Sequence, residues 1–183
     1  LALLDTTFSQ QFRLEQARAF VWGQQPTIAN FLPEHFEQRS EETAYLIRLA
    51  TLRLEALEYL LHGTMLRPPV LGVPDEEIDI SRLSIYAGQK DALKQYRKSC
   101  PRAMASAWQA RDGRVGLVLV NVTEEPQPIS LDLPREVYPI PDACTIVRIG
   151  ADGREDLGPA EGEIHLEVAL PPAGAYIYEF TGT

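Results

Sequence analysis

The residues best suited to chemistry stand together early in the chain, in the stretch ARAFVWGQQPTIANF at positions 17–31. There, Trp22 is followed by a glycine and by two amides, Gln24 and Gln25. An indole offers a flat apolar face to the C–H face of a sugar ring, and amides donate and accept hydrogen bonds as sugar hydroxyls require. Ligands of β/α barrels bind where strands end, and Ala19–Trp22 has the composition of a strand, so these three side chains are the predicted substrate-binding residues. The alternative is that Trp22 belongs to the core and the glutamines are solvated.

Two carboxylates, Glu34 and Glu37, follow on the same loop as His35. Glycosidases use a pair of carboxylates, but the pair comes from different strand ends, and acidic residues are also common where a helix begins. The histidines and cysteines have no metal-site spacing, and the chain contains no phosphate-binding loop and no nucleophile elbow. We therefore assign no catalytic residue and no metal ligand from the sequence, and we expect no cofactor.

Charge and composition narrow the partners of the protein. The 183 residues carry 17 Lys and Arg against 26 Asp and Glu, a net charge of -9, which would repel a phosphate backbone. The basic stretch Lys90–Lys98 is short, and we interpret it as a solvated helix or loop. Apolar runs do not approach the roughly 20 residues of a membrane span. We predict neither a nucleic-acid nor a membrane partner, and the compartment stays unknown because the chain starts at Leu1 without a leader.

The two cysteines, Cys100 and Cys144, could form one bridge. Their spacing is not typical of a disulfide framework or of a metal knuckle. We interpret them as two separate thiols.

The clearest helix is expected at Ser40–His62, in SEETAYLIRLATLRLEALEYLLH. Ser40 is suited to cap the first amides, two glutamates suit the positive end of the helix dipole, and Gly63 stands where a left-handed residue ends a helix. Polar residues fall on one narrow stripe, and leucines and alanines occupy most of the remaining surface. Such a wide apolar surface must be covered on several sides.

The residues upstream are expected to form only a short helix near Phe8–Gln16 and a strand at Ala19–Trp22. These two elements cover little of the apolar surface of the long helix. The order strand, loop, helix and then the apolar YLLHGTML near 59–66 is typical of the last repeats of a β/α fold. We expect residues 1–70 to be the C-terminal portion of a β/α barrel whose earlier repeats are missing.

The pattern changes after Leu66, where three prolines at 68, 69 and 74 exclude a helix, and residues 71–77 are expected to form a linker. From 78 to 183 the apolar residues alternate with a period of two, which predicts strands. The Asp-Gly pairs at 112–113 and 152–153 and the PPAG stretch at 171–174 predict the turns between them. An antiparallel β-sandwich domain is the predicted result, so the whole chain belongs to the α+β class. The predicted strands are 78–86, 103–110, 115–122, 128–133, 144–150, 164–170 and 175–180.

Three segments resemble a known group of enzymes: FVWGQQPTIANF, HGTMLRPP and SAWQARDGRVGLVLVNVTEEP. Their order is similar to the C-terminal part of large glycoside hydrolases, specifically uncharacterised bacterial glycosidase-like proteins in which a TIM barrel carries a β-sandwich. The resemblance implies that Ala19–Trp22 is the seventh barrel strand, that Ser40–Leu61 is the helix after it, and that residues 61–66 form the eighth strand. It places the catalytic carboxylates on earlier strands.

The leading interpretation is the C-terminal region of a glycoside hydrolase, with Trp22, Gln24 and Gln25 in one wall of the saccharide site and the sandwich stabilising the barrel. Its partners are a carbohydrate substrate and the missing N-terminal part of the same protein, and this segment alone is expected to be inactive. The alternatives are a non-catalytic sandwich that binds glycan or protein through exposed rings, or a structural domain whose long helix docks on a partner chain. The rings that would serve the first alternative are Trp108, Tyr138, Tyr176 and Tyr178.

Overall fold

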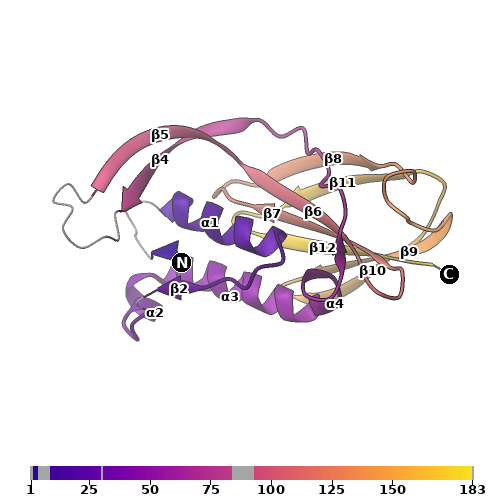
Figure 1. Ribbon diagram of the computed structural model, residues 1–183, viewed down its shortest axis with the longest axis horizontal. Helices are drawn as coiled ribbons and strands as arrows, with labels where there is room; N and C mark the ends of the chain where they lie inside the picture. Colours follow the sequence, from indigo (N-terminus) through magenta and orange to yellow (C-terminus); the bar gives the residue numbers. More distant parts are fainter. Residues whose placement is uncertain (1, 4–8, 30, 84–92, 183) are drawn as a thin grey trace.

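A computed structural model describes residues 2–3, 9–29, 31–83 and 93–182. A six-stranded sheet divides the molecule, with helices on one face and a two-stranded sheet on the other (Figure 1). The helices are α1 (Ser9–Val21), α2 (His35–Gln38), α3 (Ser40–Glu55) and α4 (Leu57–Leu60). The strands are β1 (Ala2–Leu3), β2 (Ile28–Ala29), β3 (Thr64–Met65), β4 (Asp75–Leu83), β5 (Leu93–Pro101), β6 (Ala103–Gln109), β7 (Val115–Asn121), β8 (Gln127–Leu133), β9 (Ala143–Gly150), β10 (Gly153–Glu161), β11 (Ile164–Leu170) and β12 (Ala175–Gly182).

Helix α1 includes residues that the sequence analysis assigned to a strand. The predicted strand at Ala19–Trp22 is wrong, because Ala19–Val21 forms the last turn of α1. Buried residues recur along α1 in groups of two or three about four positions apart, which is the period of a helix with one face against a core. The buried side chains are Phe12, Arg13, Leu14, Gln16, Ala17, Phe20 and Val21.

The long helix predicted at Ser40–His62 is present but interrupted. It divides at Ala56, where the backbone leaves helical geometry (φ -126°), into α3 and α4. Ser40 is not its cap, since Arg39 holds that position without a side-chain hydrogen bond. Gly63 does not adopt a left-handed conformation either. A Cβ there would lie 2.5 Å from the Tyr59 carbonyl oxygen, so close backbone packing explains this glycine.

The predicted antiparallel strands are confirmed in the large sheet, whose order is β10-β9-β12-β7-β6-β3. Strand β7 lies in its centre, and all seven of its residues are buried. Val118 and Val120 point to the helices, whereas Leu117 and Leu119 point to the opposite layer. Because both faces of β7 are covered, its sequence is almost continuously apolar.

Strands β8 and β11 form the second layer, and each alternates buried and exposed residues along its whole length. Their inward side chains make a core with the outer face of the large sheet, and this core includes Tyr178 and Phe180 of β12. Hydrophobic burial thus explains the alternation that the sequence showed.

The hairpin β4–β5 corrects another expectation. We expected Lys90–Lys98 to form a helix or loop, but β5 begins at Leu93 and pairs with β4 in register from Asp75↔Pro101 to Leu83↔Leu93. Residues 90–92, and 84–86 of the predicted strand 78–86, lie outside the described residues. Ile78, Ile80 and Cys100 bury one face of this hairpin in the core of the helical layer.

The short strands β1 and β2 pair in parallel, and α1 lies between them in the chain. They make a two-stranded sheet, and the described residues show no barrel closure. Within the region predicted as an eighth barrel strand, residues 61–66, only Thr64–Met65 forms a strand. This strand, β3, runs antiparallel to β6 at the edge of the large sheet, so the barrel assignment of this segment is wrong.

One hydrophobic core joins the helices to the large sheet. It includes Phe20 of α1, Leu49 of α3 and Tyr59 of α4, together with Val118 of β7 and Ile177 of β12. The division into residues 1–70 and 78–183, with a linker at 71–77, stays a prediction. Cys100 lies in this core and Cys144 in the other, which confirms two separate thiols.

A buried polar network also fastens α4 to the sheet. The Tyr59 hydroxyl donates to Glu179 Oε2 over 2.8 Å, and Arg114 Nη1 donates to the same oxygen over 2.8 Å. Arg154 Nη2 lies 2.7 Å from the other carboxylate oxygen. Burial raises the pKa of Tyr59 above its usual range, and the carboxylate of Glu179 raises it further, so the phenol stays a donor. Two arginines compensate the buried carboxylate, which would be costly alone.

Candidate functional site

The site begins with the strands that run parallel. Since α1 connects β1 to β2, both strands end at the same edge, and the chain that leaves β2 emerges there. In parallel β/α folds this carboxyl edge carries the binding groups, because its loops are free to vary. The residues described after β2 start at Phe31.

An aromatic cluster stands at this edge. The Phe31 ring meets the His35 ring edge-to-face with centroids 5.5 Å apart, and it meets the Phe36 ring at 5.1 Å. Phe36 is 57% exposed and Leu32 is also exposed, although Phe31 itself is half-buried. Two aromatic contacts hold Phe31, while the ring beside it stays open to solvent. The arrangement offers an apolar face at the end of a strand.

His35 adds a polar group with a defined orientation. Its Nδ1 accepts the backbone N–H of Leu32 over 3.0 Å. In the neutral imidazole the proton then sits on Nε2, which is a donor. Glu34, which precedes α2, and Glu37, within it, are exposed. An aromatic face with one donor and nearby carboxylates can bind a polyol, but it contains no pair of carboxylates from separate strands.

The predicted substrate-binding residues lie elsewhere. Trp22, Gln24 and Gln25 are exposed, with Trp22 at 61%, but they belong to the loop between α1 and β2. That loop enters β2 at its amino end, which is the edge opposite to Phe31. The prediction placed these residues at the end of a barrel strand, but the segment before them is the last turn of α1. The structure therefore does not support the argument that selected them. Their role in a saccharide site stays a prediction.

Gly23 also has a different explanation from the one the sequence suggested. Its φ is +70°, and a Cβ would lie 2.5 Å from the Leu60 carbonyl oxygen and 2.9 Å from the Trp108 ring. Arg53 Nη2 donates to the Gly23 carbonyl oxygen over 3.2 Å. The glycine therefore lets the loop pack closely on α4 and β6, and access for a sugar is not needed to explain it.

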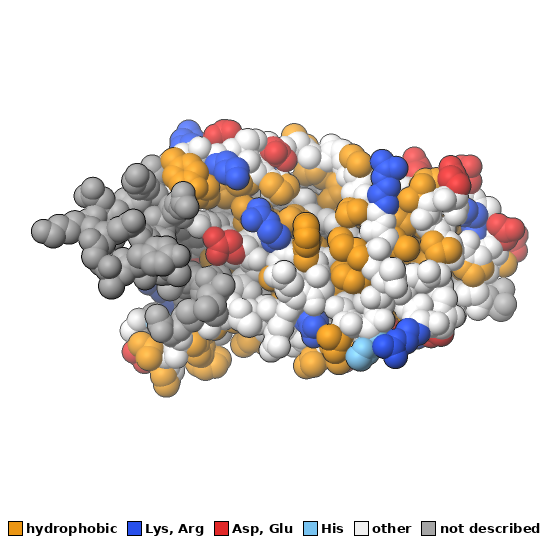
Figure 2. Space-filling model, viewed as in Figure 1, with side chains coloured by type: hydrophobic (Ala, Val, Ile, Leu, Met, Phe, Trp, Pro, Cys, Tyr) orange, Lys and Arg blue, Asp and Glu red, His pale blue; other side chains and the backbone are white. Residues whose placement is uncertain are grey.

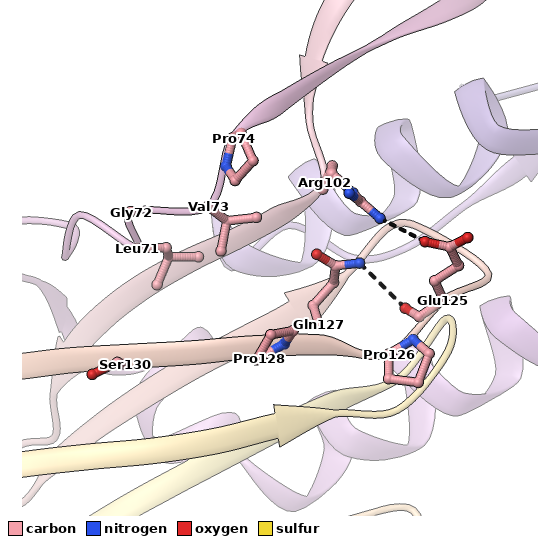
Figure 3. Close-up of a pocket in the computed structure, with 10 residues that line it drawn as sticks. All are labelled: Leu71, Gly72, Val73, Pro74, Arg102, Glu125, Pro126, Gln127, Pro128 and Ser130. Atoms are coloured by element: carbon pink, nitrogen blue, oxygen red, sulfur yellow. Dashed lines mark hydrogen bonds and ion pairs between the residues drawn. The ribbon is translucent and has the colours of Figure 1, made fainter.

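A groove lies between residues 71–74 and the turn into β8 (Figure 3). This cavity of about 560 Å³ contains Arg102, whose Nη2 lies 2.9 Å from Glu125 Oε2, and Gln127, whose amide donates to the Glu125 carbonyl oxygen over 3.4 Å. Pro126 and Pro128 line the same wall. Arg102 and Gln127 both bond to Glu125, although Arg102 Nε has no hydrogen-bond partner among the described residues. A proline in β8 removes a backbone donor that an added strand would need. The groove is thus not suited to strand addition.

Three side chains on the exposed face of β8 and β11 are arranged as in a hydrolase triad, namely Ser130, His165 and Asp132. His165 Nδ1 lies 2.7 Å from Asp132 Oδ1, and Ser130 Oγ lies 3.4 Å from His165 Nε2. However, both groups bond to Glu167 instead: Glu167 Oε1 lies 2.8 Å from His165 Nε2 and accepts the Ser130 hydroxyl over 2.8 Å. Hydrogen bonds to Asp132 and then to Glu167 raise the pKa of His165. Glu167 therefore occupies both the imidazole nitrogen and the hydroxyl that a triad would join to each other, so this cluster is not arranged as a nucleophilic site.

Metal binding finds no support either within the ranges that the structure describes. They contain no group of three or more His, Cys, Asp and Glu side chains that could hold a metal ion. In the cluster above, the imidazole lies between the two carboxylates and separates them. Nor is any helix in the described ranges long and apolar enough to cross a membrane.

The rings that would make the sheet a binding surface are mostly buried. Trp108, Tyr138 and Tyr178 are each at most 8% exposed. Tyr176 is half-buried, with the Arg148 guanidinium 4.7 Å from its ring centroid. These four side chains therefore do not form a row of exposed rings on the sheet. Sequence reasoning missed Phe31 and Phe36, although two aromatic residues so close together after the pair Ile28 and Ala29 were a usable signal.

Comparison with known proteins gives structural similarity alone. No family model matches the chain, and no curated protein matches it. A GH27 β-L-arabinopyranosidase from Geobacillus stearothermophilus is 15% identical, with a TM-score of 0.48 over 96% of this chain and 31% of that one. An α-galactosidase I from Mortierella vinacea is 10% identical, with a TM-score of 0.42 over 99% of this chain and 40% of that one. A variant of the arabinopyranosidase was solved with arabinose. The chain thus spans about a third of the length of the first of these structures.

Proposed function

We propose that this chain is the C-terminal region of a glycoside hydrolase, in which β1, α1, β2 and α3 complete a β/α barrel and the antiparallel sheets brace it. The observation that carries the proposal is the parallel pair β1–β2 joined by α1. A parallel pair of two-residue strands is not stable alone, and such crossover units normally extend into larger sheets with helices on the outside. The sequence resemblance to large glycosidases supplies the reaction class.

The outer face of α3 and α4 supports the same conclusion. Ile47 and Leu54, seven residues apart, lie along one side of α3, and Leu54 is 68% exposed. Leu61, directly after α4, is exposed as well. In Figure 2 hydrophobic side chains gather along the lower edge of the molecule, where Figure 1 draws α2 and α3. An apolar stripe of this length is typical of a surface that another element covers. In the proposed barrel the neighbouring repeats cover it.

The saccharide wall has two candidate positions. The carboxyl edge of β2 presents Phe36, supported by Phe31 and His35, and a barrel uses this edge for its ligand. Trp22, with Gln24 and Gln25, is the alternative wall at the opposite edge. Whichever position forms the wall, its residues bind the sugar, and the catalytic carboxylates come from other repeats of the barrel.

The test uses the protein translated from the same reading frame together with the residues before Leu1. That protein should hydrolyse aryl glycosides, whereas the 183-residue chain should not. In the longer protein Phe36→Ala should raise KM and leave kcat nearly unchanged, because it removes uniform binding. Trp22→Ala is the matched aromatic control, and a larger effect from it would move the wall to the amino edge. Turnover by the 183-residue chain alone would contradict the proposal.

A further inference from the structure

A second cavity, of about 430 Å³, lies where α1 and α3 approach the turns that follow β7 and β11. It is separate from the carboxyl edge of β2 and from the groove beside β8. Its lining comes from four segments distant in sequence, which the fold brings together, and three of them supply polar side chains. The polar side chains that face it are Arg13, Glu41, Tyr45, Arg48 and Glu124.

Both arginines are held in place by the turns. Arg13 is 6% exposed, donates from Nε to the Val122 carbonyl oxygen over 2.9 Å, and pairs through Nη2 with Glu124 Oε1 over 2.9 Å. Arg48 donates from Nη1 to the Ala173 carbonyl oxygen. Each anchor leaves further N–H groups on the guanidinium. Two fixed cations therefore line one cavity, and each has N–H groups beyond those that these bonds use.

Tyr45 supplies a third polar group. Its side chain is 1% exposed, and no hydrogen-bond partner of its hydroxyl is found among the residues that the structure describes. Tyr45 lines the same cavity as Arg13 and Arg48. Burial raises the pKa of this phenol, while the charges of Arg13 and then Arg48 lower it. A buried hydroxyl without a partner is costly, and an acceptor placed between the arginines would remove that cost.

The charges define the acceptor. Arg13 and Arg48 are balanced by Glu124, which already pairs with Arg13, and by Glu41 in the first turn of α3. A doubly charged phosphate would be repelled by the carboxylates of Glu41 and Glu124. A ligand with one carboxylate group carries only one negative charge and is repelled less. The two oxygens of that carboxylate match the fork of a guanidinium and leave a lone pair for a phenol.

We propose that this cavity binds a monoanionic carboxylate between Arg13, Arg48 and the Tyr45 hydroxyl. The carboxylate belongs either to a small organic acid or to an acidic sugar. The inference concerns a site that the proposed hydrolase activity does not use, and it holds whether or not the longer protein is a glycosidase.

Titration calorimetry of the 183-residue chain tests it with sodium acetate, sodium glucuronate, sodium phosphate and neutral glucose as probes. Saturable binding of acetate or glucuronate, without binding of glucose, is expected. Equal affinity for both acids identifies a general carboxylate site, and tighter glucuronate identifies an acidic-sugar site. Tighter binding of phosphate than of either acid, or equal binding of glucose, would overturn the proposal, as would the absence of saturable binding.

Variants locate the site. Arg48→Met should weaken carboxylate binding about tenfold, and Tyr45→Phe about threefold, by the usual strengths of charged and neutral hydrogen bonds. Arg48→Lys, which keeps the charge but loses the fork, should fall between wild type and Arg48→Met. Arg111→Met in the exposed turn before β7 is the matched control and should bind as wild type does. Circular dichroism confirms that each variant is folded, and a folded Arg48→Met with unchanged affinity would refute the site.

Discussion

Tyr59 and Tyr45 are two fully buried tyrosines for which the structure predicts opposite effects of the same substitution. Tyr59 is 0% exposed and Tyr45 is 1% exposed. The Tyr59 hydroxyl donates to the Glu179 carboxylate over 2.8 Å, whereas the Tyr45 hydroxyl has no partner among the described residues. Replacing each tyrosine by phenylalanine removes one oxygen and almost no volume, so the hydrogen bond is the main difference between the two variants.

The magnitudes follow from these partners. A hydrogen bond to a charged group contributes about 1.5–3 kcal/mol, and Arg114 and Arg154 still hold Glu179 in Tyr59→Phe, so we expect a loss of about 1.5–2 kcal/mol. For a chain of this size that lowers Tm by roughly 3–8 °C. Tyr45→Phe should leave the free energy of unfolding unchanged or raise it by up to about 1 kcal/mol, because it removes an unsatisfied buried hydroxyl.

Urea denaturation followed by circular dichroism measures both variants. Equal m-values are needed for the comparison, because m reports the surface exposed on unfolding. If Tyr45→Phe lost as much stability as Tyr59→Phe, the assignment of satisfied and unsatisfied hydroxyls would be refuted. Preserved stability in Tyr59→Phe would show that the network does not fasten α4 to the sheet.

Three further outcomes are expected. Gly116→Ala should cost about 1–3 kcal/mol in urea denaturation, because a Cβ would lie 2.8 Å from the Tyr59 ring, and a neutral result would show that the ring can move. His165 should titrate by NMR above its ordinary pKa, since its carboxylate partners favour the cation, and a midpoint at or below the ordinary value would exclude the pairing. The contribution of His165 to stability is complete below its pKa in the unfolded chain and is lost as pH rises through its pKa in the folded protein. Cys100 and Cys144 should resist alkylation in the native protein and react in urea, because both are buried and burial raises their pKa, and rapid native reaction would contradict the separate cores.

The antiparallel half of the chain was predictable because one physical rule dominates it. In β8 and β11 every second side chain is buried, so the alternation in sequence is the alternation in space. The Asp-Gly pairs also marked real turns, since Gly113 and Gly153 have φ of +92° and +115°. Strand β10 was missed because it is an exposed edge with a register shift near Gly158, and its residues are largely polar.

The helical half was harder because short apolar runs fit more than one structure. The residues Phe20 and Val21 have the composition of a strand, but tertiary packing keeps them in α1, whose buried positions continue a helical period from Phe12. That error placed Trp22 at the end of a strand, whereas it lies in the loop between α1 and β2. The aromatic cluster around Phe31 depends on the position of β2, which local pattern alone did not reveal.

The central claim is that the open apolar face of α3 is covered by preceding repeats of the same protein. Leu54→Cys measures this directly, since Cys100 and Cys144 are buried and contribute little alkylation. The new thiol should react in the 183-residue chain at nearly the rate of a free thiol, and about a hundredfold more slowly in the protein that also carries the residues encoded before Leu1. Equal rates in the two proteins, or a reading frame that begins at Leu1, would contradict the account.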